Sequence, residues 1–199
     1  SDGHSVTFCV RACFSGLGVP FCQRSRTTDQ NVKALRFFKG AGYEADIDVI
    51  CKSDCASEIV NAVTELKWLP DKSLENKWPH NTVHERWQGT LKSVQRACLL
   101  QSGFPMDVWH WSLMYASVIL SLCQMCPMLP TDLDEKGKTL PESECKLTWT
   151  CWMAHHGGKD FTGPKEPFGR LCYYYDRSNP SLQAQASPGL FVGWFLEPG

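Results

Sequence analysis

Residues 83–98, VHERWQGTLKSVQRAC, carry the longest helical pattern in the sequence. Apolar side chains recur there every three or four residues, at Val83, Trp87, Leu91, Val94 and Cys98. The opposite side carries the polar set Glu85, Gln88, Lys92 and Arg96. This pattern predicts an amphipathic helix that packs on a core and ends at Gly103-Phe104-Pro105.

Strands and helices alternate before this helix. Val6, Phe8 and Val10 alternate with more polar residues, which predicts a half-buried strand with an antiparallel partner at 19–24. Pro20 places that partner at a sheet edge or a bulge. Further patterns predict a helix capped at Thr28-Asp29 and stopped by Gly40 and Gly42, and then a strand over 47–51. A second helix carries Ile59, Val60, Val63 and Leu66 on one side and is broken at Leu69-Pro70-Asp71. A short strand or an irregular link follows over 74–78.

The region after Pro105 begins with an apolar stretch. Residues 108–130 contain no Asp, Glu, Lys or Arg and are long enough to span a bilayer. They also contain His110, several serines and two prolines, and no basic cluster flanks them, so we expect a buried helix and no membrane. Residues 130–145 are polar and rich in proline, which predicts a linker or a long loop. Residues 171–175 and 190–196 predict two strands.

The composition excludes several classes of protein. The 199 residues are 43% hydrophobic and 21% charged, which is ordinary for a globular protein and too apolar for a disordered one. The net charge of −1 excludes a strongly basic protein that coats nucleic acid, although not a local basic face. Eleven cysteines cannot all pair within one chain, and their spacing shows no dense scaffold. We therefore expect mostly reduced thiols. Ser1-Asp2-Gly3-His4 lacks the basic and apolar regions of a signal peptide, so we expect no signal peptide and a location in the nucleus or cytoplasm.

Two carboxylates stand where a metal site could form. Asp54 follows the strand predicted over 47–51, and Glu85 lies in the first turn of the long helix. Hard cations such as Mg²⁺ prefer oxygen ligands, and two such ions can activate a water or hydroxyl against a phosphodiester. Solvated helix caps would give the same pattern, so spacing alone does not separate the two interpretations.

Longer matches surround these two residues. Ser53-Asp54-Cys55-Ala56-Ser57-Glu58-Ile59 resembles the Ser-Asp-Asn-Ala-x-Glu segment of retroelement integrases. Pro79-His80-Asn81-Thr82-Val83-His84-Glu85-Arg86 resembles their Pro-x-Asn-(Gly/Ala)-x-x-Glu-Arg segment, and thirty residues separate Asp54 from Glu85. Further matches follow in order along the chain, at Ser15-Gly16, Gly103-Phe104-Pro105 with Trp109, Phe161-Thr162-Gly163-Pro164, Pro167-Phe168-Gly169, and Pro188-Gly189-Leu190-Phe191-Val192-Gly193-Trp194.

This ordered set is similar to the integrase core of copia-type retrotransposon polyproteins. The resemblance implies an α/β, ribonuclease H-like mixed sheet flanked by helices, with a small β-rich C-terminal extension. It divides the chain into a catalytic core over 1–128, a linker or loop over 129–160, and the extension over 161–199. It also implies DNA processing and strand transfer with Mg²⁺ or Mn²⁺, in which Asp54 and Glu85 are two of three catalytic metal ligands.

The resemblance also implies partners. The long helix of the family contacts DNA, which makes Lys92, Arg86, Asn81 and Arg96 the expected ligands of double-stranded DNA, both element ends and target. A solvated helix face would account for the same cations. Integrases work as multimers on two DNA ends, so a homo-oligomer is expected.

This sequence departs from the family pattern at several positions. The first Asp of the family lies on a strand upstream of the 6–13 hairpin, so we expect this chain to begin after it and to be inactive by itself. Cys55 replaces the family's Asn, Thr82 its frequent Gly, and Arg11-Ala12-Cys13 its acidic residues before the Ser-Gly turn. These changes keep an alternative open, a degenerate, non-catalytic remnant that acts as a DNA- or protein-binding module.

The cysteines and histidines suggest two further kinds of site, a zinc site and a nucleophilic pair. Cys123-x-x-Cys126 could join Cys145, Cys151, His155 or His156 around zinc, although the second half of the sequence has no matching pair and a loop at His155-His156 is the simpler interpretation. Cys55 with His80 or His84 could form a nucleophilic pair, but nothing supplies an orienting group or an oxyanion hole.

Overall fold

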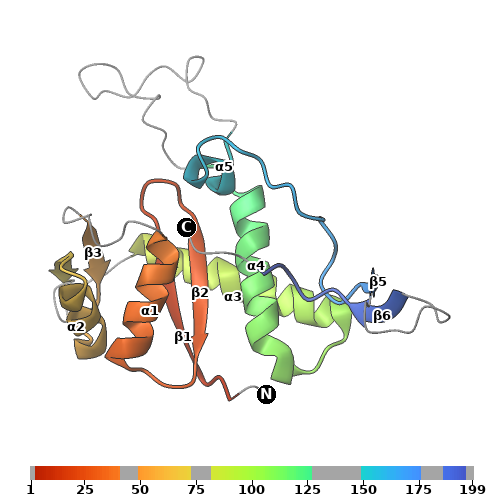
Figure 1. Ribbon diagram of the computed structural model, residues 1–199, viewed down its shortest axis with the longest axis horizontal. Helices are drawn as coiled ribbons and strands as arrows, with labels where there is room; N and C mark the ends of the chain where they lie inside the picture. Colours follow the sequence, from red (N-terminus) through yellow and green to blue (C-terminus); the bar gives the residue numbers. More distant parts are fainter. Residues whose placement is uncertain (1–2, 41–48, 73–81, 127–148, 176–185, 196–199) are drawn as a thin grey trace.

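The computed structural model describes residues 3–40, 49–72, 82–126, 149–175 and 186–195 (Figure 1). The elements, in order, are β1 (Val6–Arg11), β2 (Gly18–Gln23), α1 (Thr28–Lys39), β3 (Ile50–Ser53), α2 (Ser57–Glu65), β4 (Leu69–Lys72), α3 (Thr82–Ser102), the short 3-10 helix η2 (Met106–Val108), α4 (Trp109–Cys123), α5 (Cys151–His155), β5 (Leu171–Tyr175) and β6 (Ala186–Leu190). The mixture of helices with short strands confirms the α/β class.

The hairpin predicted near the start of the chain is confirmed. β1 and β2 pair antiparallel from Val6 opposite Gln23 to Arg11 opposite Gly18. Pro20 lies within β2, opposite Cys9, and β2 is a sheet edge among the described strands, which suits a residue without a backbone N–H. The hairpin places the Ser15-Gly16 turn and Arg11 at the same end of the molecule.

The N-cap of α1 lies one residue earlier than the predicted cap. Thr27 is the N-cap, and its side chain accepts a hydrogen bond from the backbone N–H of Gln30. Gly40 ends the helix with a φ of 76°, a left-handed conformation that favours glycine, whereas Gly42 lies outside the described residues. Val32 and Leu35 are buried on the inner face of the helix.

The segment from β3 to β4 corrects one prediction. Leu69-Pro70-Asp71 does not merely end α2, because residues Leu69–Lys72 form β4, which pairs parallel with β3. The sequence offered only Leu69 as an apolar residue there, so no strand pattern was visible, and the pairing depends on α2 bringing the chain back beside β3. The strand or link expected over 74–78 lies outside the described residues, and β3 starts at Ile50 within the expected 47–51 range.

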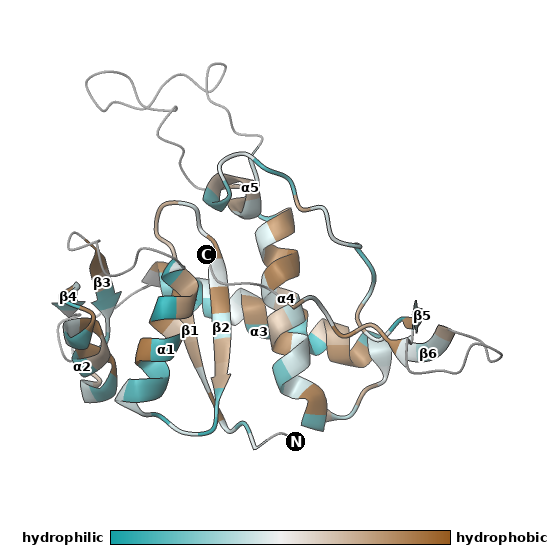
Figure 2. Ribbon diagram, viewed as in Figure 1, coloured by the Kyte–Doolittle hydropathy of each residue, from teal (hydrophilic) through white to brown (hydrophobic). Residues whose placement is uncertain are grey.

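The hairpin of β1 and β2 lies between two helical layers. Phe8 and Val10 of β1 pack against the buried side chains of α1 and α2, together with Cys51 of β3. Cys9 of β1 and Cys22 of β2 point the other way, into the cluster that Trp87 and its neighbours form between α3 and α4. Figure 2 shows the hairpin beside α1, with the apolar positions of α3 and α4 on its other side.

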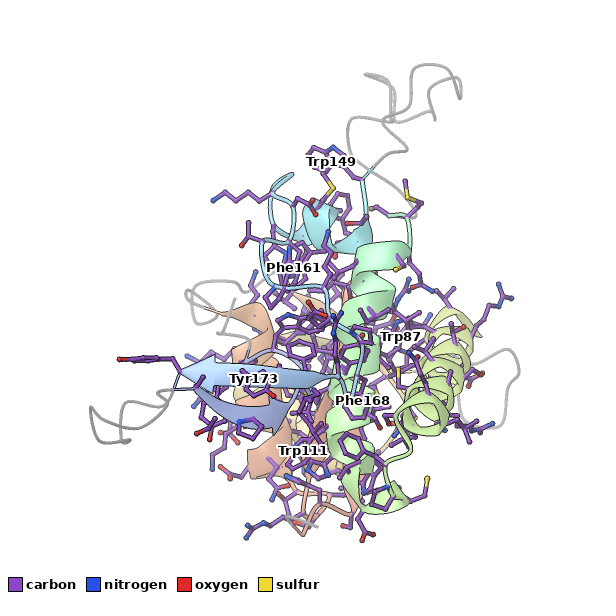
Figure 3. All side chains as sticks on the ribbon, turned by 90° about the vertical axis from the view of Figure 1, so that its right-hand side faces the viewer. Trp87, Trp111, Trp149, Phe161, Phe168 and Tyr173 are labelled. Atoms are coloured by element: carbon purple, nitrogen blue, oxygen red, sulfur yellow. The ribbon has the colours of Figure 1, made fainter. Side chains whose placement is uncertain are left out.

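The long helix and the apolar helix are both confirmed. Trp87, Leu91 and Cys98 of α3 are buried as the spacing predicted, although Val83 is exposed. Figure 3 shows Trp87 between α3 and α4. Gly103, with a φ of 69°, separates α3 from η2 and α4. No helix in the described part of the chain has both the length and the apolar character needed to cross a membrane.

The C-terminal third holds two corrections. The expected loop at His155-His156 is a helix, because Cys151–His155 forms α5, capped by the Thr150 side chain on the Met153 N–H. β5 matches the strand predicted over 171–175, but its partner β6 ends at Leu190, where the second predicted strand was to begin. The sequence pattern missed β6 because Ser187, Pro188 and Gly189 give it no alternation.

The segment after residue 160 packs on the same core as α3 and α4. Phe168, 4% exposed, lies in a cluster with Cys98, Leu99 and Tyr115 (Figure 3). The Trp194 ring stacks on Tyr115 at a centroid distance of 5.3 Å and an interplanar angle of 8°. The expected boundaries at 128 and 160 stay predictions, and residues 127–148 lie outside the described ranges.

The described strands form three separate pairs, β1 with β2, β3 with β4, and β5 with β6. In the view of Figure 2, β3 lies on the side of β4 that is nearer to β1. Residues of β1 and of β3 pack against one cluster of buried side chains, which joins the two pairs through α1 and α2. Within the described residues, no strand joins β1 to β3.

Candidate functional site

Asp54 lies at the carboxyl end of β3, where the chain turns into α2. Its side chain is exposed, and Oδ1 accepts a hydrogen bond from the backbone N–H of Ala56, the N-cap residue of α2, at 3.3 Å. Asp54 therefore also holds the turn that starts α2, which is the ordinary task of an Asp in this position. The second carboxylate oxygen, Oδ2, has no hydrogen bond within the described residues.

Glu85 lies in the first turn of α3, with its side chain exposed. The unpaired N–H groups at a helix start carry partial positive charge and favour a carboxylate there. The preceding residue, His84, is half-buried, and its Nε2 is 2.9 Å from Nε2 of Gln88 one turn later. Its ring also lies 5.7 Å from the Trp87 ring.

His84 shows which charged groups converge at this place. Burial lowers the pKa of its imidazole, the Arg11 guanidinium lowers it further, and the carboxylates of Glu85 and Asp54 act against both. The four side chains come from the end of β1, the end of β3 and the start of α3. Asp54 and Glu85, thirty residues apart in the sequence, are thus close enough for both charges to act on one imidazole.

Arg11 is the unexpected member of this group. It is the last residue of β1 and is half-buried, and its Nε is buried with no hydrogen-bond partner in the described part of the chain. Its charge also lowers the pKa of the Cys151 thiol, which burial raises. The charge of Arg11 therefore acts both on His84, beside Glu85, and on Cys151, the first residue of α5.

The exposed face of α3 carries a polar stripe in line with Glu85. At about 100° per residue, Glu85, Lys92 and Arg96 fall within about 40° of one another around the helix. All three are exposed, and a Cβ at Gly89 between them would meet nothing within 4 Å. Lys92 also lies near β1, because its charge acts on the buried Cys9 thiol, whose pKa is raised to about 12 mainly by burial.

The other expected DNA ligands have different positions. Arg86 is exposed on α3 but about a quarter turn away from the stripe. Asn81 lies outside the described residues. Lys92 and Arg96 are therefore the two expected DNA ligands that share a face with Glu85, and their role in DNA binding stays a prediction.

The described residues do not complete a metal site. Asp54 and Glu85 supply two carboxylates, but no group of three or more His, Cys, Asp or Glu side chains in the described ranges could hold a metal ion. Arg11, close to the same point, opposes the approach of a cation. Mg²⁺ is usually held by one or two carboxylates together with waters and substrate phosphates.

The zinc set and the nucleophilic pair gain no support. Cys126 and Cys151 are buried and donate to the carbonyls of Phe14 and Met125, and His155 Nδ1 is 3.2 Å from Ser15 Oγ. His84 faces Gln88, and His80 lies outside the described residues. Cys145 also lies outside them, so the zinc hypothesis is tested only for its other members.

Sequence patterns missed the convergence on His84. In the sequence, Arg11 belongs to the polar side of a predicted half-buried strand, and His84 is only the residue before Glu85 in the integrase-like segment. The signal was available only in part, as an arginine at the end of a strand and a histidine beside Glu85. Which strand end faces which helix start depends on packing that no local spacing encodes.

The sequence matches no protein-family model and no curated protein. The structure is similar to solved retroviral integrase catalytic cores. One is the HTLV-2 integrase catalytic core domain in complex with magnesium, in a trimeric form, at 16% identity and a TM-score of 0.45, covering 75% of this chain and 84% of that one. Another is the catalytic core domain of BIV integrase, at 16% identity and a TM-score of 0.40, covering 67% and 87%.

A third similar structure is the simian T-cell lymphotropic virus intasome, at 18% identity and a TM-score of 0.45. The match covers 88% of this chain and 58% of that chain. Similarity at this level leaves the function to be argued from the residues of the chain itself.

Proposed function

We propose that this chain belongs to an integrase-type core that binds duplex DNA and, with a third carboxylate supplied from outside the described residues, cuts and joins it with Mg²⁺ or Mn²⁺. The observation that carries the proposal is that Asp54 directly follows β3 and Glu85 lies in the first turn of α3, at places from which both charges act on the His84 imidazole. It agrees with the ordered motif set, in which the same two carboxylates are metal ligands. The copia-type assignment, the homo-oligomer, and the nuclear or cytoplasmic location are parts of this proposal.

The polar stripe of α3 supports DNA binding beside those carboxylates. Lys92 and Arg96 follow Glu85 along one exposed face, with Gly89 leaving the backbone open between them. A duplex laid along this face would exchange counterions for these cations, so binding would weaken as salt rises. The net charge of −1 leaves the rest of the surface without a strong general attraction for DNA.

The ribonuclease H-like sheet is also part of the proposal. β1 and β3 each have one edge that pairs with no described strand, and residues of both pack against one buried cluster. One further strand between them would join the two pairs into a single mixed sheet. A carboxylate on that strand would come close to the ends of β1 and β3, where Arg11 and Asp54 lie.

A degenerate, DNA-binding remnant is the second candidate, and two observations favour it. Arg11 places a positive charge where the two carboxylates converge, and Asp54 Oδ1 is engaged by the Ala56 N–H. Both would weaken the binding of a divalent cation. Neither affects the Lys92 and Arg96 stripe, so a remnant would keep DNA binding while lacking the joining reaction.

The experiment is a Mn²⁺-dependent strand-transfer or disintegration assay on three proteins. They are this chain, a version extended upstream of Ser1 along its natural coding sequence, and the same extended version with Glu85→Gln. A fluorescent duplex titration at two salt concentrations runs beside the assay, so that binding is measured separately from joining.

Joining by the extended protein, abolished by Glu85→Gln, would support the catalytic form of the proposal. Duplex binding by all three proteins without joining by any, while the extended protein is folded, would establish the remnant. If no protein joined DNA and none bound it in a salt-dependent way, both forms of the proposal would be wrong.

A further inference from the structure

A cavity of about 860 Å³ lies beside β2, between α1 and α4. Its wall includes all of β2, one face of α1, one face of α4, and residues of α5 and the C-terminal segment. Cavities of 300–1,000 Å³ with mostly apolar walls are the usual size and character of ligand sites. Neither the carboxylates nor the stripe of α3 lines it, so it is separate from the proposed DNA site.

Aromatic rings dominate this wall and come from five different parts of the chain. They are Phe21 of β2, Phe37 of α1, Trp111 of α4, Trp152 of α5 and Trp194 of the C-terminal segment. Trp111 keeps 43% of its surface exposed, so part of its indole remains accessible. Phe21 and Phe37 meet edge to face, with centroids 5.8 Å apart. Rings arranged in this way bind a flat, aromatic guest better than a branched aliphatic one.

The charges around the cavity have one sign. Arg24 and Lys33 line it, whereas no Asp or Glu among the described residues does. Lys33 is paired with Asp29 at 2.8 Å, but Arg24 has no carboxylate partner in the described part of the chain. A guanidinium presents paired donors that match a carboxylate, sulfonate or phosphate group.

We infer that this cavity binds a planar aromatic anion. The rings of the wall contact its flat part, and the Arg24 guanidinium pairs with its negative group. A mononucleotide and an aromatic acid both have this chemistry, and the test separates them. The site is independent of the proposed DNA function, so either can fail alone.

The test uses this chain and the fluorescent probe anilinonaphthalenesulfonate, which has fused rings, a sulfonate and one N–H. Its neutral counterpart phenylnaphthylamine has the same rings and N–H without the sulfonate. Titration calorimetry gives affinity and stoichiometry, and energy transfer from tryptophan reports binding near Trp111, Trp152 and Trp194. Displacement by deoxyadenosine monophosphate or by naphthoate then shows which source of the chemistry the site accepts.

Two variants and one control place the probe in this cavity. Arg24→Gln removes the charge from an exposed side chain, and Arg26→Gln makes the same change on an exposed arginine that does not line the cavity. Phe37→Ala removes one ring from the wall. Circular dichroism and thermal unfolding of each variant show whether it is folded, because the probe also binds partly unfolded proteins.

We expect one probe per chain and weaker binding of the neutral counterpart. Arg24→Gln should weaken the probe about threefold to tenfold and Phe37→Ala by a similar factor, while Arg26→Gln leaves the affinity unchanged. Displacement by either competitor supports the inference and identifies the source. Equal binding by the Arg24→Gln, Arg26→Gln and parent proteins, equal affinity for the neutral probe, or binding of several probes per chain would overturn it. If Phe37→Ala proves unfolded, the Arg24 and neutral-probe comparisons still decide.

Discussion

Gly18 of β2 packs against the indole of Trp87 on α3 so closely that a Cβ at residue 18 would lie 2.2 Å from the ring carbon Cζ2. Trp87, 5% exposed, is also the centre of the cluster that joins α3 to α4. One glycine in the hairpin therefore sets how near the long helix lies to the sheet. The same approach fixes where the first turn of α3, with His84 and Glu85, stands relative to the end of β1.

Gly18→Ala should destabilise the protein because the added methyl must displace a rigid, buried ring. Overpacking of this kind costs about 1–3 kcal/mol. Urea unfolding followed by tryptophan fluorescence measures it. Gly89→Ala is the matched control, since a Cβ there meets nothing within 4 Å and alanine favours a helix over glycine by about 1 kcal/mol. Equal effects of the two substitutions would contradict the Gly18–Trp87 packing.

Phe168→Ala should cost about 3–5 kcal/mol, because this side chain is 4% exposed and contacts the cluster of Cys98, Leu99 and Tyr115. Phe195→Ala should change the stability by less than about 0.5 kcal/mol, since Phe195 is 95% exposed. Thermal unfolding of both variants beside the parent tests whether the segment after residue 160 is integral to the core. A small effect at Phe168 would mean that this segment is an independent unit.

Lys92→Ala should weaken duplex DNA binding by about the same factor for every sequence and lower the salt dependence of log K by about 0.9, the contribution of one phosphate contact. The measurement is fluorescence anisotropy of a labelled duplex over a range of salt concentrations. Arg26→Ala, which removes an exposed cation away from α3, serves as the control and should leave the slope unchanged. An unchanged slope for Lys92→Ala would place the DNA elsewhere on the protein.

Acid should destabilise the protein through His84 and His155. Burial is the main cause that lowers the pKa of each imidazole, and His156 and Lys39 lower that of His155 further. Below about pH 6.5 the unfolded chain takes up protons that the folded chain refuses. The stabilisation from these neutral histidines is therefore complete above that pH and is lost as pH falls through the lower, folded-state pKa.

Each histidine contributes at most about 1.4 kcal/mol per pH unit to this loss. Urea unfolding of the parent, His84→Gln and His155→Gln between pH 8 and pH 5 measures it, and each substitution should flatten the decline. Glutamine can keep the contact to Gln88 in one case and to Ser15 Oγ in the other, so stability near pH 8 should change little. The prediction fails if both variants decline as steeply as the parent.

The local structure of the N-terminal half could be predicted because its patterns are redundant. The β1–β2 hairpin, α1, α2 and α3 each show an apolar period, and most also have a cap, a glycine or a proline at an end. β4 and β6 could not be predicted, because Pro70 and Asp71 in one, and Ser187 to Gly189 in the other, disfavour a strand by propensity. Both exist only through a partner strand that lies elsewhere in the sequence.

The sequence by itself determined the amphipathic face of α3, the placement of Asp54 and Glu85 at a strand end and a helix start, and the glycines that end α1 and α3. These are local properties, governed by backbone propensity and by the period of apolar residues. Only the tertiary structure decided that the charges of Arg11 and the two carboxylates act on the same residue, His84. It also decided that the aromatic cavity forms beside β2, and that Phe168 packs into the core with Cys98, Leu99 and Tyr115. Those relations depend on how sheet and helices pack, because side chains far apart in the chain meet only where buried surfaces fit together.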